Sequence, residues 1–173
     1  MSVTTGPNRV DSFERFFLDE HPKLVAMGLG WTGNPDTARE LSQEALARAY
    51  RAWDRVEHLD IPGAWVRRVM VNLLIDDRRT AHRAAELNQR LAPPVQADGL
   101  GGPDVLTDDD RWWLAVRALP DRERAAVTLH YLEDLPIAEV AQILEIAPGT
   151  VKSSLAHARQ KLRAALIDQE TDR

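Results

Sequence analysis

Pro136–Arg159, PIAEVAQILEIAPGTVKSSLAHAR, is the segment that decides the fold. Its apolar residues recur at three- and four-residue steps in two stretches, of which the first ends near Leu144 and the second starts at Pro148. Proline suits a first helical position, because its missing N–H would be unsatisfied there in any case and its fixed φ matches the helix. The segment therefore predicts two short helices joined by a tight turn, which is the geometry of a helix-turn-helix.

The second helix of this segment has two different faces. Its apolar side chains fall within a stripe about 60° wide, which must face a core. This stripe consists of Val151, Leu155, Ala158 and Leu162. The opposite face holds Gly149, Ser153, Ala156, Gln160 and Arg163, with Thr150, Lys152, His157, Arg159 and Lys161 on its flanks.

The charge of this helix favours an anionic partner. Between Glu145 and Asp168 there are four basic residues and no acidic one. Basic side chains gathered on one helix are typical of contact with nucleic-acid phosphates. A solvated basic helix that ends a small bundle is the alternative, since cations are also favourable near a helix C-terminus without any ligand.

Charge and composition divide the chain into two halves. Residues 1–90 and 111–173 each carry equal numbers of acidic and basic residues, whereas residues 91–110 carry five acidic residues and no basic one. Residues 91–104 also contain three prolines and three glycines, which disfavour regular structure. We therefore expect residues 91–108 to be a flexible acidic linker between two domains, at residues 10–90 and 109–168.

The two halves show helical periodicity, and β-branched residues are too sparse for strands, so we expect an all-α fold of two small helical domains. In the first half we expect a helix capped by Ser12, a second at residues 24–29, a third at about 36–54 and a fourth at about 64–83. The second half is expected to hold four helices, one of them capped by Asp121. In the fourth helix, Trp65 is expected to belong to the core, with a platform for base stacking as the alternative.

Several classes of protein are excluded by what the sequence lacks. The chain has no cysteine, which rules out a disulfide framework and a thiolate zinc site. It has no P-loop, nucleophile elbow, paired metal ligands or cofactor fingerprint, so we expect no enzyme and no cofactor. No basic, apolar leader and no run of about 18 apolar residues is present, so we expect a cytoplasmic protein without membrane insertion.

Two sets of motifs carry a resemblance to a known family. In the second half they are Leu119-Pro120, Glu139-Val140-Ala141, Gly149-Thr150-Val151-Lys152-Ser153 and Lys161-Leu162-Arg163, and in the first half they are Glu40-Leu41-Ser42-Gln43-Glu44 and the series Trp65, Asn72, Asp76 and Arg79. Their order and spacing resemble regions 4 and 2 of the extracytoplasmic-function (ECF) sigma factors of the sigma-70 family. The resemblance implies a protein that binds core RNA polymerase and directs promoter-specific transcription initiation. Implied partners are the clamp helices and flap of polymerase, promoter DNA and an anti-sigma factor.

The resemblance also implies three sets of site residues. Polymerase would be bound by Glu40, Leu41, Gln43 and Glu44, although the family usually has aspartate where Glu40 stands. The −10 promoter element would be bound by His58, Leu59, Asp60, Arg68, Asn72 and Arg79. The −35 element would be bound by Thr150, Lys152, Ser153, Ala156, His157 and Arg159. For the −10 element we further expect a basic phosphate-binding surface made of Arg67, Arg68, Arg78, Arg79 and Arg83.

The chain departs from the family pattern in the helix-turn-helix. Ala147 stands in place of a capping serine, Ser154 in place of a common arginine, and Ala156-His157 in place of a more aromatic or basic pair. These departures predict weaker affinity for DNA and a distinct sequence preference. The alternative function is a stand-alone helix-turn-helix regulator, which would leave the motifs of the first half unexplained.

Overall fold

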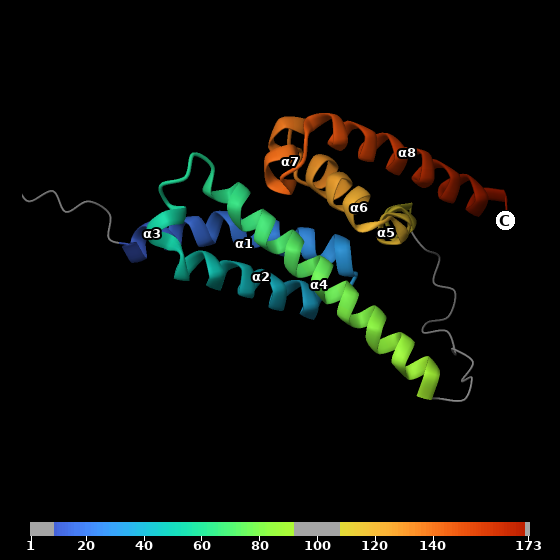
Figure 1. Ribbon diagram of the computed structural model, residues 1–173, viewed down its shortest axis with the longest axis horizontal. Coiled ribbons are helices and arrows are strands. Elements are labelled where there is room, and N and C mark those ends of the chain that lie inside the picture. The colour runs from blue at the N-terminus through green and yellow to red at the C-terminus, as the bar shows by residue number, and fades with distance from the viewer. Residues whose placement is uncertain (1–8, 92–107, 172–173) are drawn as a thin grey trace, which may run out of the picture.

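All regular elements of the described residues, 9–91 and 108–171, are helices in this computed structural model (Figure 1). They are α1 (Arg9–Thr32), α2 (Pro35–Arg51), α3 (Trp53–Val56), α4 (Pro62–Leu91), α5 (Asp108–Ala118), α6 (Asp121–Val127), the π-helical turn η1 (Thr128–Leu132), α7 (Ile137–Leu144) and α8 (Pro148–Thr171). The all-α prediction is confirmed. Apart from its two end positions, the predicted linker lies outside the described residues.

A single helix, α1, spans the region where the first two helices were predicted. It runs through Pro22, which is exposed, so the backbone hydrogen bond that proline cannot donate is lost on the solvent side. The prediction that Ser12 caps a helix was wrong. Ser12 lies inside α1, where its hydroxyl accepts a hydrogen bond of 2.8 Å from the Trp53 indole and lies 3.0 Å from a carboxylate oxygen of Glu57. This serine therefore joins α1 to α3.

The ends of α2 and α4 follow from local chemistry. Gly33 adopts a positive φ of 70°, and the Asn34 side chain then accepts hydrogen bonds from two backbone N–H groups of the first turn of α2. Pro35 occupies the first position of that helix. Helix α2 ends at Arg51, earlier than predicted, and α4 extends to Leu91, further than predicted.

The helix-turn-helix forms as predicted. Glu145, with a left-handed φ of 52°, ends α7, and the Ile146 N–H donates a 3.1 Å hydrogen bond to the Ala141 carbonyl. Pro148 is the first residue of α8, as expected. The predicted apolar stripe of α8 is buried in full, with Leu162 2% exposed and Val151 0%. The prediction that Asp121 caps α6 was wrong, because Pro120 holds the cap position and the Asp121 side chain pairs with Arg78 instead.

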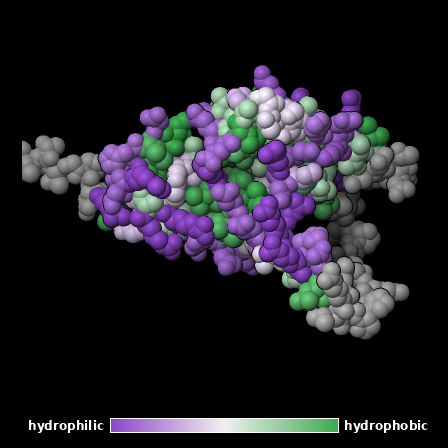
Figure 2. Space-filling view, viewed as in Figure 1, coloured by the Kyte–Doolittle hydropathy of each residue, from purple (hydrophilic) through white to green (hydrophobic). Residues whose placement is uncertain are grey.

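The two halves pack against each other and share one hydrophobic cluster. Helix α1 contacts α5 and η1, while α4 contacts α7 (Figure 1). Gly30 permits the close approach of α1 and α5, because a Cβ there would lie 2.6 Å from Cζ3 of Trp113. The Arg124 guanidinium lies 5.1 Å from the centre of the Trp31 ring. Hydrophobic residues gather in the middle of the face drawn in Figure 2, between hydrophilic margins.

Candidate functional site

The first predicted set of site residues lies on α2. Glu40 and Gln43 are exposed, and Leu41 and Glu44 are half-buried. A 2.7 Å hydrogen bond from Arg48 holds the pKa of the Glu44 carboxyl below its ordinary value. Within the part of the chain that the structure describes, Glu40 has no hydrogen-bond or ion-pair partner. The predicted set thus has one engaged carboxylate, Glu44, and one available carboxylate, Glu40.

An apolar groove lies beside this set and was not predicted. It has a volume of about 270 Å³ and is lined by Phe13 and Phe17 of α1 and by Gln43, Leu46, Ala47 and Tyr50 of α2. Tyr50 is 44% exposed, and its ring packs edge-on against Phe13 with the ring centres 4.9 Å apart. The spacing of Phe13 and Phe17, four residues apart on one helix face, is the sequence signal that could have indicated it.

The second predicted set is divided between two places. His58, Leu59 and Asp60 are exposed in the loop between α3 and α4, where Nδ1 of His58 lies 2.9 Å from the Asp54 carbonyl oxygen. The other three line one wall of a cleft of about 320 Å³ and do so without the loop residues; they are Arg68, Asn72 and Arg79 of α4. The facing wall comes from α6, α7 and the turn after α7, and includes Asp121, Arg122 and Glu145.

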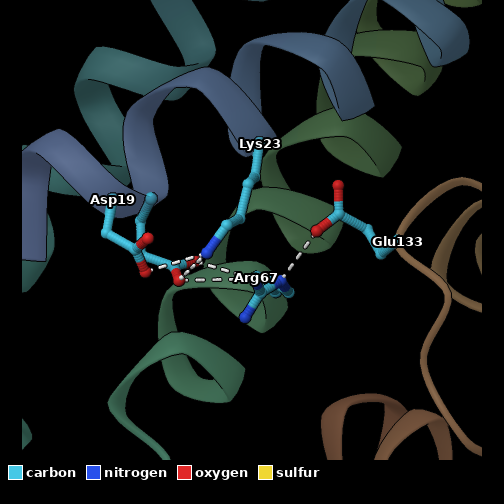
Figure 3. Close-up of polar contacts among 5 residues, drawn as sticks. Asp19, Lys23, Arg67 and Glu133 are labelled. Atoms are coloured by element: carbon cyan, nitrogen blue, oxygen red, sulfur yellow. Dashed lines mark hydrogen bonds and ion pairs between the residues drawn. The ribbon is translucent and has the colours of Figure 1, made fainter.

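Three arginines of α4 are engaged by acidic residues. Arg68 pairs with Glu145, and Arg78 pairs with Asp121. Arg67, the third, is 8% exposed and lies between Glu20 of α1 and Glu133, at 3.1 Å from each (Figure 3). The predicted basic surface is therefore wrong for Arg67, because burial of this helix face removes its guanidinium from solvent.

Lys23 extends this charged cluster toward the surface of α1 (Figure 3). Its ammonium group is 2.8 Å from an oxygen of Asp19 and 3.1 Å from one of Glu20. The hydrogen bond between Lys23 and Asp19 lowers the pKa of the aspartate and raises the pKa of the lysine. The Lys23 ammonium is thus held in the charged form between two acidic groups.

The third predicted set lies together on the outward face of α8. All of its members are exposed except Thr150, which is half-buried: Lys152, Ser153, Ala156, His157 and Arg159. Lys161, at the flank, is held 2.8 Å from Glu123 of α6. Ser154 is 5% exposed, so this departure from the family pattern falls on the inner face of the helix.

Trp65 is half-buried and packs against the hydrophobic cluster, as expected of a core residue.

Among the described residues, no group of three or more His, Cys, Asp or Glu side chains could hold a metal ion. Within the same part of the chain, no helix is long and apolar enough to cross a membrane.

Comparison with known proteins gives two family matches. Residues 16–84 match the model of Sigma-70 region 2, and residues 109–162 match that of Sigma-70, region 4. The chain is 30% identical over 168 residues to the RNA polymerase sigma-E factor of Streptomyces coelicolor, covering 92% of this chain and 89% of that protein. It is 29% identical over 157 residues to the ECF RNA polymerase sigma factor SigW of Bacillus subtilis, covering 84% of each.

A solved structure has the same fold. It is that of the sigma factor RpoE in complex with the anti-sigma factor NepR from Bartonella quintana, with a TM-score of 0.70 and 23% identity. The alignment covers 89% of this chain and 96% of that one.

Proposed function

Because the chain belongs to the ECF class of sigma-70 family RNA polymerase sigma factors, which direct transcription initiation, we propose that it does so through three separate surfaces. Helix α2 binds core polymerase, α4 with the loop before it binds the −10 element, and α8 binds the −35 element. The chain provides binding surfaces and no catalytic group. The stand-alone regulator is disfavoured, because it leaves the region 2 match without a role.

The outward face of α8 is the observation that carries the −35 assignment. Its inner face is buried in the helix-turn-helix, which leaves small and polar side chains and three unpaired cations, Lys152, Arg159 and Arg163, facing outward. Here unpaired means without an acidic partner among the described residues. A helix with such a face can enter a major groove, where Arg159 contacts phosphate and His157 lies toward base edges.

The −10 assignment rests on α4 and the loop before it. Leu59 and Ile61 are 39% and 40% exposed, which places apolar groups where an unstacked base can be received. Asn72 can hydrogen-bond to a base edge, and Arg79 can contact the phosphates of the displaced strand. Capture of bases that have left the stack favours strand opening without an enzymatic step.

The polymerase assignment rests on α2 and the adjacent groove. The available carboxylate of Glu40 suits a basic residue of the clamp helices of the largest subunit, and the groove at Phe13 and Tyr50 suits an apolar side chain beside it. Region 4 would bind the flap. An anti-sigma factor that covers these surfaces would prevent initiation. Because polymerase and promoter DNA lie in the cytoplasm, we expect the protein to act there.

Transcription in vitro from a genomic promoter library tests the proposal. Core polymerase is supplied with and without the protein, and the 5′ ends of the transcripts are sequenced. Defined starts that depend on the protein, with shared sequences upstream, support it. DNA binding without any such starts would contradict it, since a regulator that does not act with polymerase gives that result. The variant Glu40→Arg serves as the matched test of α2, because it should lose starts while keeping its affinity for −35 duplex DNA.

A further inference from the structure

A second cleft between the two halves is lined by arginines. It has a volume of about 280 Å³ and is bordered by the end of α1, the start of α2, and parts of α4, α5 and α6. It shares no lining residue with the cleft at Asn72. Region 2 supplies one of its arginines, and region 4 supplies the other two: Arg78, Arg117 and Arg124.

Carboxylates balance these cations only in part. Arg78 pairs with Asp121, whereas Arg117 and Arg124 form no ion pair with a carboxylate of the described residues. Among the described residues that line the cleft, Asp77 is the only acidic one. Burial and the nearby Arg78 lower the pKa of Arg124 to about 10, so its guanidinium is charged at neutral pH. The cleft therefore holds an excess of positive charge.

Two buried N–H groups of the lining residues have no acceptor in the part of the chain that the structure describes. They are Nε1 of Trp31, which is 2% exposed, and Nε of Arg124, which is 3% exposed. The Arg124 guanidinium lies 5.1 Å from the centre of the Trp31 ring, so the two side chains form one wall. Buried donors are normally paired, because an unpaired one destabilises the fold. Donors and cations together suit a negatively charged ligand with several acceptor oxygens.

We propose that this cleft binds a phosphate or diphosphate group, with Arg117, Arg124 and Trp31 as its principal donors. The proposal does not depend on the promoter-binding roles of α4 and α8. Guanidinium groups match the charge and the fork geometry of phosphate oxygens. The start of α2 also faces the cleft through Asn34 and Thr37, and the N-terminal end of a helix favours an anion.

The size and the position of the cleft restrict the ligand and determine its effect. Small-molecule pockets usually have volumes of about 300–1,000 Å³, so this smaller cleft suits a compact anion. Because Trp31 belongs to region 2 while Arg117 and Arg124 belong to region 4, one bound phosphate joins the two halves. A ligand that binds only the folded chain stabilises it by mass action. Phosphate should therefore raise the midpoint of thermal unfolding.

Isothermal titration calorimetry on the full chain tests the proposal with three probes: inorganic phosphate, pyrophosphate and the nucleoside diphosphate ADP. Ionic strength is held constant with sodium chloride, which separates a specific site from general screening of charge. Thermal unfolding followed by circular dichroism gives the second readout and establishes that each variant is folded.

Two substitutions each remove one kind of donor from the cleft. Arg117→Gln removes a guanidinium, and Trp31→Phe keeps an aromatic ring but removes the indole N–H. The matched control is Arg55→Gln, which makes the same change as Arg117→Gln at an exposed position of α3, outside the cleft.

We expect the parent chain and Arg55→Gln to bind pyrophosphate with equal affinity and to gain the same thermal stability from it. Arg117→Gln should bind about tenfold more weakly and Trp31→Phe about fivefold more weakly, as for the loss of a charge-assisted and of a single hydrogen bond. Tighter binding of ADP than of pyrophosphate would support the proposal with a nucleotide as the source of the group. Equal or weaker binding of ADP would support it with the free anion as the source.

Three results would overturn the proposal. In the first, the folded parent chain binds none of the three probes. In the second, folded Arg117→Gln and Trp31→Phe both bind pyrophosphate as tightly as the parent chain does. In the third, Arg55→Gln loses as much affinity as Arg117→Gln, which would show that the probes respond only to the net charge of the chain.

Discussion

Helices α4 and α8 are both basic helices with a proposed DNA-binding face, yet they stand in opposite environments. Arg67 of α4 is 8% exposed and held by two carboxylates, while Lys152 and Arg159 of α8 are exposed. The difference does not come from the number of cations. It comes from acidic groups of region 4, which pair with Arg67, Arg68 and Arg78 of α4, whereas Lys152 and Arg159 of α8 have no acidic partner among the described residues. The same half of the chain thus carries one proposed DNA-binding surface and supplies carboxylates to three arginines of the helix that carries the other.

The largest effect on stability is expected for Arg67, the buried arginine of α4. Arg67→Met leaves Glu20 and Glu133 buried without their cation, and should lower the free energy of unfolding by about 3–5 kcal/mol. Its neighbour provides the control. Arg68→Met removes an exposed pair with Glu145 and should cost about 0–1 kcal/mol. Urea titrations followed by circular dichroism compare the two, and equal losses would show that Arg67 is not buried in solution.

Arg124 tests the contact between the halves. It donates hydrogen bonds to the backbone carbonyls of Arg117 and Leu119 at the end of α5, and lies over Trp31 of α1. Burial lowers its pKa to about 10, so it is charged at neutral pH. Arg124→Leu removes donors from buried carbonyls and should cost about 1–3 kcal/mol in unfolding free energy. Trp31 fluorescence should change as well, and an unchanged spectrum would contradict the contact.

The sequence predicted the faces of α8 better than the environment of α4. Periodicity and the position of Pro148 gave the buried stripe, because both are local signals. The cap predicted at Ser12 was wrong, since its hydroxyl bonds to Trp53 instead, 41 residues away. The region 4 partners of Arg67 and Arg68 are 66 and 77 residues distant along the chain. The spacing of residues along one helix gives no information on ion pairs between residues so far apart in the sequence. The basic surface was therefore predicted to be exposed.

For the open helix, two substitutions separate positioning from recognition. Arg159→Ala should weaken binding to every −35 duplex alike and reduce the slope of log affinity against log salt by about 0.9, as expected for one lost phosphate contact. His157→Ala should change the preferred sequence with little change in that slope. Band-shift titrations with altered −35 sequences measure both. Equal losses on all duplexes in both variants would remove His157 from sequence recognition.

The smallest effect on stability is expected for the pair of Lys23 and Asp19, at the solvent-exposed edge of the charged cluster. Lys23 lowers the pKa of Asp19, so this pair stabilises the fold above the ordinary pKa of the aspartate, and its contribution is lost as pH falls through the lowered value. Both side chains are substantially exposed, and Asp19→Asn should cost below about 0.5 kcal/mol at neutral pH. The difference from the parent chain in unfolding free energy should vanish in acid. A difference in unfolding free energy that grows as pH falls would contradict this prediction.

Binding of two separate promoter probes to the full chain tests the central claim most directly. One probe is duplex DNA with the −35 element, the other is the single non-template strand of the −10 element, and each is titrated with and without core polymerase. The account predicts that the chain on core polymerase binds both probes, the duplex through α8 and the single strand through α4. If core polymerase with the chain binds the single strand no more tightly than core polymerase alone does, α4 is not the −10 surface and the claim is contradicted.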